Sequence, residues 1–219
     1  MHLRFCAIVT FFYLLTAGLL VGLPSPAQAI ISDSLKLSKQ DTTDLMRMQQ
    51  SLNSAKTIQA RFLQVSSNGE YAEGQFSLQR PGRLNLTYDP PNPLKVVADG
   101  TYISYIDREL DQATTLPISL TRAELLLRDS FSFFGKDLII TGFERSPGVL
   151  RVSLVKAGEP LQGNLTLVFS DSPLEIRKWV VTDDQGVTTT VSLLGPSFNI
   201  ALDKQLFYYM PPDAKVISK

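Results

Sequence analysis

Apolar and polar side chains alternate with a period of two along most of the chain after residue 57, as in half-buried β-strands. In the clearest run, Phe76 and Leu78 alternate with Gln75, Ser77 and Gln79. Turn signals such as Asn-Gly and Pro-Gly separate the runs, so we expect a meandering antiparallel sheet. The predicted strands begin at 57 and then cover 74–80, 83–88, 94–98, 101–107, 138–144, 149–155, 164–169, 175–182 and 187–194.

Two segments have helical spacing instead. Apolar residues recur every three or four positions from Leu45 to Ala55, and Asp41 is placed to cap this helix. The second candidate covers residues 119–128, where three consecutive leucines give a wide apolar face. These elements predict one mainly β (α+β) domain.

The first 29 residues have the layout of a secretory signal peptide. Arg4 precedes an apolar run over residues 5–23, and helix-breaking prolines and the small-residue sequence Ala27-Gln28-Ala29 follow it. The alternative is an uncleaved membrane anchor, because the run is about as long as a bilayer requires. The prolines and small residues favour cleavage after Ala29. We therefore expect a periplasmic protein whose domain covers residues 30–219.

Composition excludes several kinds of chemistry. The only cysteine is Cys6 and the only histidine is His2, so both are lost with the leader. The mature chain then has no disulfide, no Cys or His nucleophile and no His- or Cys-bound metal. Basic and acidic residues balance at 21 each, which argues against nucleic-acid binding. Hydrophobic residues make up 44% of the chain, enough for a sizeable core.

The sequence lacks complete motifs for phosphate binding, calcium binding or glycoside hydrolysis. Gly135-Lys136 lacks the earlier glycine and the following Ser or Thr of a phosphate loop. The acidic residues at 107, 109 and 111 lack the glycine and the final glutamate of a calcium loop. Nothing places two carboxylates across a cleft, as glycoside hydrolysis requires. We expect no enzyme activity, no catalytic residue, no metal and no cofactor.

Arg80 does not fit a purely structural pattern. It follows Phe76 and Leu78 at a period of two, so a continued strand would point its guanidinium to the apolar face. A guanidinium keeps its charge, and there it must find carbonyl or carboxylate oxygens. In the alternative, the strand ends at Gln79 and Arg80 is a solvated turn residue before Pro81.

A series of segments begins at Phe62-Leu63-Gln64, includes the helix around Leu125-Leu126-Leu127, and ends at 207–212. By the order and spacing of these segments, nearly all of the mature chain resembles the LolA family, the periplasmic carriers of outer-membrane lipoproteins. One difference is Leu86, where the family often has a large aromatic residue. The similar segments are the sequence at 74–82, Leu84-Asn85-Leu86-Thr87-Tyr88, Pro90-Pro91, Val97-Ala98-Asp99-Gly100, Tyr102-Ile103-Ser104-Tyr105 and Asp111-Gln112-Ala113-Thr114.

This resemblance implies an unclosed antiparallel half-barrel whose helices cover a concave apolar face that holds acyl chains. Arg80 corresponds to the arginine that bonds the backbone of the helical lid and keeps the empty cavity shut. The expected partners are acylated lipoproteins, an inner-membrane ABC transporter as donor and an outer-membrane receptor as the candidate acceptor. We expect a monomer. The alternative function is a periplasmic sensor or assembly factor that uses the same fold for recognition.

Alternation along the strands gives the candidate cavity residues. Ile176 and Trp179 are three apart, so a regular strand would place them on opposite faces unless a bulge intervenes. The predicted lid residues are Leu126 and Leu127. The predicted wall residues are Phe62, Phe76, Leu78, Leu84, Leu86, Tyr88, Ile103, Tyr105, Val152, Leu154, Leu165, Leu167, Phe169, Ile176 and Trp179.

Overall fold

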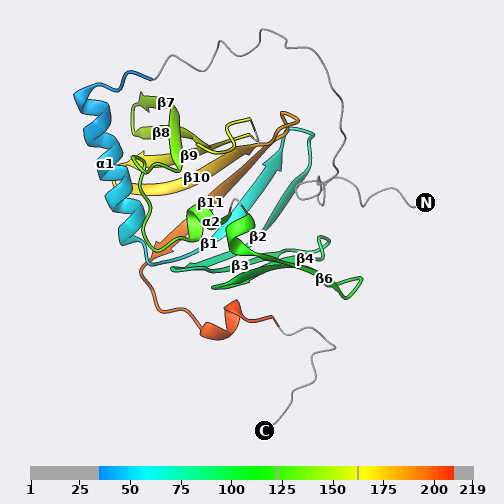
Figure 1. The fold of residues 1–219 in the computed structure, drawn as a ribbon. Helices are drawn as coiled ribbons and strands as arrows, with labels where there is room; N and C mark the ends of the chain where they lie inside the picture. Colours follow the sequence, from blue (N-terminus) through cyan, green and yellow to red (C-terminus); the bar gives the residue numbers. More distant parts are fainter. Residues whose placement is uncertain (1–34, 122, 162, 210–219) are drawn as a thin grey trace, which may run out of the picture. The chain divides into compact units, whose positions relative to one another are not determined.

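Eleven strands form a single antiparallel sheet in the part of the chain that the structure describes (Figure 1). This computed structural model describes residues 35–121, 123–161 and 163–209. The predicted signal peptide and the end of the 207–212 motif lie outside these ranges. The region from Leu37 onward is one compact unit. Among the described helices, none has the length and apolar character needed to cross a membrane.

The sheet is unclosed, as the resemblance to the LolA family implied. Its strand order is β6-β5-β4-β3-β2-β1-β11-β10-β9-β8-β7, which leaves β6 and β7 at opposite edges. Each pair of neighbours is antiparallel, and β1 pairs with β11 at the centre. The strands are β1 (Thr57–Ser66), β2 (Tyr71–Gln79), β3 (Arg83–Tyr88), β4 (Leu94–Asp99), β5 (Tyr102–Asp107), β6 (Gln112–Pro117), β7 (Leu138–Ser146), β8 (Val149–Lys156), β9 (Asn164–Asp171), β10 (Leu174–Thr182) and β11 (Thr188–Phe198).

Helix α1 (Lys39–Ser54) precedes the first strand and packs against β10. The prediction that Asp41 caps it is wrong, because the N-cap is Ser38. Asp41 is the partner residue of a capping box: its carboxylate accepts from the Ser38 backbone N–H at 2.9 Å. The apolar stripe is buried as predicted, and Leu45, Met48 and Leu52 are at most 1% exposed.

The connection from β6 to β7 carries the chain from one sheet edge to the other. It contains a 3-10 turn, η2 (Ile118–Leu120), and a short helix, α2 (Ala123–Leu127), rather than the single helix predicted over 119–128. The Thr121 backbone N–H and hydroxyl both bond the Ile118 carbonyl, which ends the first turn. Leu125 and Leu127 are buried in the same core as α1, so this connection covers the same face of the sheet.

Gly74 on β2 allows two aromatic rings to meet across the sheet. Gly74 pairs with Phe62 on one side and with Tyr88 on the other. A Cβ at this position would lie 2.2 Å from the Thr87 carbonyl oxygen and 2.8 Å from the Phe62 ring. Without that Cβ, the rings of Phe62 and Tyr88 pack edge to face with centroids 5.1 Å apart.

The segment after β11 covers part of the opposite face of the sheet. It includes the 3-10 turn η3 (Lys204–Phe207), which lies against β3 and β4. Asn85, which alternates with the core residues of β3, donates its side-chain N–H to the Leu206 carbonyl at 2.5 Å. Phe207 of the closing motif is 1% exposed, and it belongs to η3 rather than to the main core.

Candidate functional site

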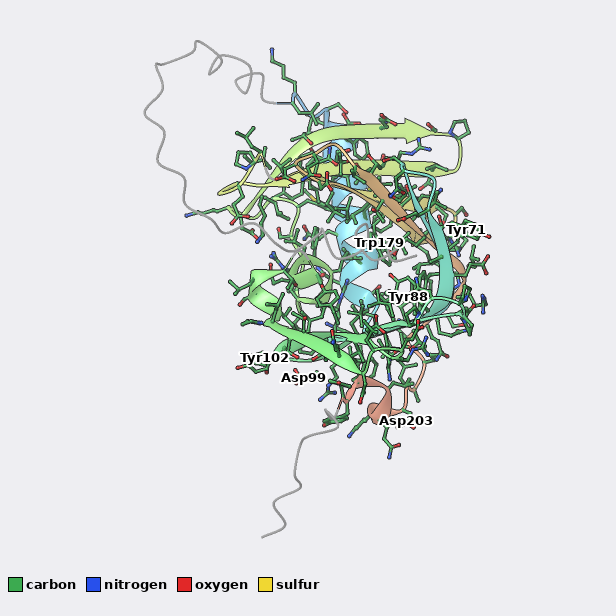
Figure 2. All side chains as sticks on the ribbon, turned by 90° about the vertical axis from the view of Figure 1, so that its right-hand side faces the viewer. Tyr71, Tyr88, Asp99, Tyr102, Trp179 and Asp203 are labelled. Atoms are coloured by element: carbon green, nitrogen blue, oxygen red, sulfur yellow. The ribbon has the colours of Figure 1, made fainter. Side chains whose placement is uncertain are left out.

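The predicted cavity residues lie together in one core between the sheet and the helices. Leu86, Tyr105 and Leu126 are partly buried and pack against this core, and the other members are buried. Figure 2 shows Trp179 and Tyr88 in the interior, whereas Tyr71 and Tyr102 lie at the outside. The alternation of the strands therefore brings side chains from both halves of the sheet onto one apolar face.

A bulge in β10 resolves the spacing of Ile176 and Trp179. The pairing of β10 with β9 shifts by one residue between Ile176 and Lys178. As a result, Ile176 pairs with Phe169 and Trp179 pairs with Leu167, both of which are buried. The extra residue turns both side chains to the interior.

The apolar interior is nearly filled beneath α2 in this conformation. A cavity of about 10 Å³ remains under α2, roughly the space of a single water molecule. A chain-like ligand does not fit this space unless the helices move away from the sheet. Three of the lining residues, Leu52, Ile58 and Leu193, were not among the predicted cavity residues, although Leu52 follows the helical period and Ile58 the strand period. The cavity is lined by Leu52, Ile58, Phe76, Leu78, Arg80, Leu126, Ile176, Trp179 and Leu193.

Arg80 combines parts of the two alternatives considered for it. Strand β2 ends at Gln79, so the backbone of Arg80 belongs to the turn. Its side chain nevertheless points inward and is 7% exposed. The guanidinium Nε donates to the Leu126 carbonyl at 3.0 Å, and Nη1 donates to the Leu52 carbonyl. The alternative in which Arg80 is a solvated turn residue is therefore excluded.

The two carbonyls that hold Arg80 come from the C-terminal ends of α1 and α2. The last carbonyls of a helix lack intrahelical partners and carry partial negative charge, so they suit a cation. Burial lowers the pKa of the Arg80 guanidinium to about 10, so it remains charged at neutral pH, and Asp129 acts in the opposite direction. Within the described ranges, no carboxylate lies within 4.0 Å of this guanidinium. One buried charge thus joins both helices to the sheet.

Side chains of α1 also hold the segment that follows α2. The Asn53 amide bonds both backbone groups of Phe131, accepting from its N–H at 2.8 Å and donating to its carbonyl at 2.9 Å. Gln49 accepts from the Phe133 N–H at 3.0 Å. The rings of Phe131 and Phe133 are fully buried and pack edge to face, 4.8 Å apart. We refer to α1 together with residues 123–133 as the lid.

An ion-pair cluster attaches the other end of α1 to the sheet. Asp44, which is 6% exposed, binds Arg145 of β7 at 2.6 Å and Arg47 at 2.8 Å. Arg145 also binds Asp41, and Arg47 reaches Asp171 at the end of β9. Burial alone would raise the pKa of Asp44, but the hydrogen bonds from Arg145 and Arg47 outweigh it and hold this pKa below its usual value.

This cluster predicts acid sensitivity. A depressed carboxylate pKa stabilises the fold above the pKa of the unfolded chain, about 4, and this stability is lost as the pH falls through the folded pKa. For Asp44→Asn we expect a loss of about 2 kcal/mol at pH 7. We also expect its stability to fall less steeply than that of the wild type below about pH 5. Urea unfolding across this range measures both effects.

The exposed turn residue Asp184 provides the control. Asp184→Asn should leave both the stability and its pH profile unchanged, because surface substitutions away from such networks have small effects. Equal pH profiles for Asp44→Asn and the wild type would show that the cluster does not contribute as described.

Residues 53–210 match the family described as outer membrane lipoprotein carrier protein LolA. The outer-membrane lipoprotein carrier protein of Azotobacter vinelandii is 28% identical over 191 residues, covering 84% of this chain and 91% of its own. That of Pseudomonas fluorescens is 30% identical over 189 residues, covering 82% and 90%.

Two solved structures are also similar. An uncharacterized conserved protein from Thermus thermophilus has a TM-score of 0.49 and 14% identity, covering 80% of this chain and 97% of its own. A LolA superfamily protein from Nitrosomonas europaea has a TM-score of 0.44 and 8% identity, covering 75% and 97%. The family match begins at the end of α1 and spans residues 123–133, the whole sheet and η3, and the chain belongs to the LolA family of outer membrane lipoprotein carrier proteins.

Proposed function

We propose that this protein is a periplasmic, non-enzymatic carrier that shelters the acyl chains of lipoproteins and moves them from the inner to the outer membrane. Family membership supports this function. The structural observation that carries it is an apolar interior closed by a lid, with the buried Arg80 bonded to carbonyls of both lid helices. We further propose that residues 1–29 direct export and that residues 30–219 form the carrier domain.

The energetics of the cargo explain why such a lid is useful. Each buried methylene group is worth about 0.8 kcal/mol, so one sixteen-carbon chain is worth on the order of 12 kcal/mol. A carrier that bound this anchor without any opposing cost would not release it. Opening the lid breaks the bonds of Arg80 and separates apolar contacts, and this cost offsets part of the binding energy. Affinity for the cargo is thereby kept moderate.

The proposed partners follow from this balance. Extraction of the cargo from the inner membrane requires an energy source, and we propose an ABC transporter in that role. Transfer at the outer membrane then requires only an acceptor that binds the anchor more tightly, such as a receptor. The candidate cavity residues and the Arg80 latch belong to this proposal.

Extraction from membranes tests the function. The protein lacking residues 1–29 is mixed with energised inner-membrane vesicles that contain the transporter and an acylated lipoprotein. We expect the lipoprotein to appear in the soluble fraction as a complex with the carrier. A lipoprotein variant that cannot be acylated serves as control and should form no complex. Retention of the acylated lipoprotein by the vesicles at every carrier concentration would refute the proposal.

A further inference from the structure

A second set of polar side chains borders the apolar interior. It lies at the end of β2 that is farther from Arg80. It consists of the side chains of Gln64 on β1, Tyr88 on β3 and Tyr105 on β5, which we call the polar cluster. Tyr88 pairs with Gly74, six residues before Arg80 along β2. At about 3.3 Å per residue, roughly 20 Å of apolar wall separates the cluster from Arg80.

The members of the polar cluster lie close together. The Tyr88 hydroxyl donates to the Gln64 carbonyl oxygen Oε1 at 2.8 Å. Tyr88 is 6% exposed, and burial raises its pKa to about 12. Tyr105 is partly buried against the same core, and its pKa is raised by burial and, to a lesser extent, by Tyr88. Val96 of β4 pairs with Leu86 of β3 on one side and with Tyr105 of β5 on the other, so the register places Tyr105 on the same face of the sheet as Tyr88, two strands away.

Apolar groups surround the polar cluster on the concave face. The Phe62 ring packs against Tyr88, and Tyr105 pairs with Val96, which is 4% exposed. Two arginines near this end, Arg61 and Arg108, bind other groups. Arg61 binds Glu73 and Asp89 on the outer face of the sheet.

Arg108 lies near Tyr88 but does not enlarge the cluster. Its guanidinium donates to backbone carbonyls, reaching Tyr88 at 2.8 Å and Pro93 at 2.9 Å. The donors that face the interior at this end are therefore uncharged phenol and amide groups.

Uncharged donors in apolar surroundings suit a neutral acceptor. Phenol O–H and amide N–H groups each donate to a carbonyl oxygen. A phosphate or carboxylate entering the same place would lose its hydration without gaining a cation, which is costly. Binding pockets that are mostly apolar commonly orient their ligand through a few such polar groups.

We infer that Gln64, Tyr88 and Tyr105 bind the carbonyl oxygens of the ester groups that link the fatty-acyl chains to the lipid anchor. This inference rests on the proposed carrier function and specifies how the ligand lies. The ester end is held at the polar cluster, and the chains run along Phe76 and Trp179 towards Arg80. When a carbonyl binds, the Tyr88 hydroxyl exchanges its present acceptor, Gln64, for the ligand.

Paired ligands test this inference. One is a synthetic diacylated lipopeptide with ester-linked chains, and the other is its ether analogue, which lacks the carbonyl oxygens. Binding of both is measured for the wild type and for Tyr88→Phe. We expect the variant to bind the ester lipopeptide about fivefold more weakly, as the loss of one hydrogen bond predicts, and the ether analogue unchanged. This selective loss isolates the interaction with the carbonyl.

Tyr102→Phe is the matched control, because Tyr102 lies on β5, the strand that also carries Tyr105, but is 48% exposed. It should bind both ligands as the wild type does. Thermal unfolding of each variant verifies that the fold is retained.

The remaining outcomes are also decisive. If Tyr88→Phe weakens the binding of both ligands equally, Tyr88 acts through packing. If it weakens the binding of neither, Tyr88 has no role in binding. Either result overturns the inference and leaves the carrier function standing. If the wild type binds neither lipopeptide, the carrier function itself fails. A phospholipid with ester-linked chains of equal length shows whether the site distinguishes the source of the ester. The same fivefold loss with that phospholipid would support the ester chemistry for both sources.

Discussion

Arg80→Leu is expected to bind cargo and then fail to release it. The substitution removes the hydrogen bonds from Arg80 to the Leu52 and Leu126 carbonyls, which join both lid helices to Arg80 in the closed structure. Hydrogen bonds to a charged group are worth about 1.5–3 kcal/mol each. Burial of the guanidinium cancels part of this gain, so we expect the transfer rate to an acceptor membrane to fall by at least about tenfold.

Transfer of a radiolabelled lipoprotein from the purified complex to outer-membrane vesicles measures this effect. Arg83→Leu is the control: Arg83 begins β3 on the far side of the same turn and is only partly buried. It should transfer cargo as the wild type does. An Arg80→Leu carrier that loads and unloads at wild-type rates would show that Arg80 does not act as a latch.

Asn53→Leu is expected to have the largest effect on stability. The Asn53 amide hydrogen-bonds both the backbone N–H and the carbonyl of the buried residue Phe131. A leucine at position 53 would leave both backbone groups without these partners. Each unsatisfied buried group costs about 1–3 kcal/mol, so we expect a loss of about 3 kcal/mol in the free energy of unfolding. Even in the absence of cargo, the segment around Phe131 should also separate from α1, and this separation should expose the apolar interior.

Urea unfolding measures the first effect, and binding of a hydrophobic dye to the folded protein measures the second. Gln50→Leu, an exposed position on the same helix, controls for adding leucine to α1. If Asn53→Leu is as stable as this control and binds no more dye, the lid is not held together through Asn53.

The sheet could be predicted from the sequence because half-buried strands impose a period of two. The strand that was missed, β6, lies at the sheet edge, and its first four residues are exposed on both faces. An alternation of apolar and polar residues is therefore not required in β6, and none is seen. The predicted helix over 119–128 is shorter in the structure because Thr121 interrupts it with local hydrogen bonds.

The interior could be predicted for the same reason, but the contacts that close it could not. Alternation indicates which side chains share a face, and it gave an inward-pointing Arg80 as one of two alternatives. It does not reveal that Arg80 would bond Leu52, 28 residues away, or that Asn53 would bond Phe131, 78 residues away. Such contacts depend on how the lid packs, and polar residues on a helix carry no local signal of their distant partners.

Tryptophan fluorescence tests the central claim most directly, because the chain contains a single tryptophan. Trp179 lines the cavity, packs against Phe76 at 5.5 Å and is 9% exposed. A diacylated lipopeptide with a nitroxide group in the middle of one acyl chain quenches only fluorophores that it touches. The account predicts that Trp179 is quenched and that quenching saturates at one lipopeptide per protein. A lipopeptide that binds the protein but leaves Trp179 unquenched would contradict it.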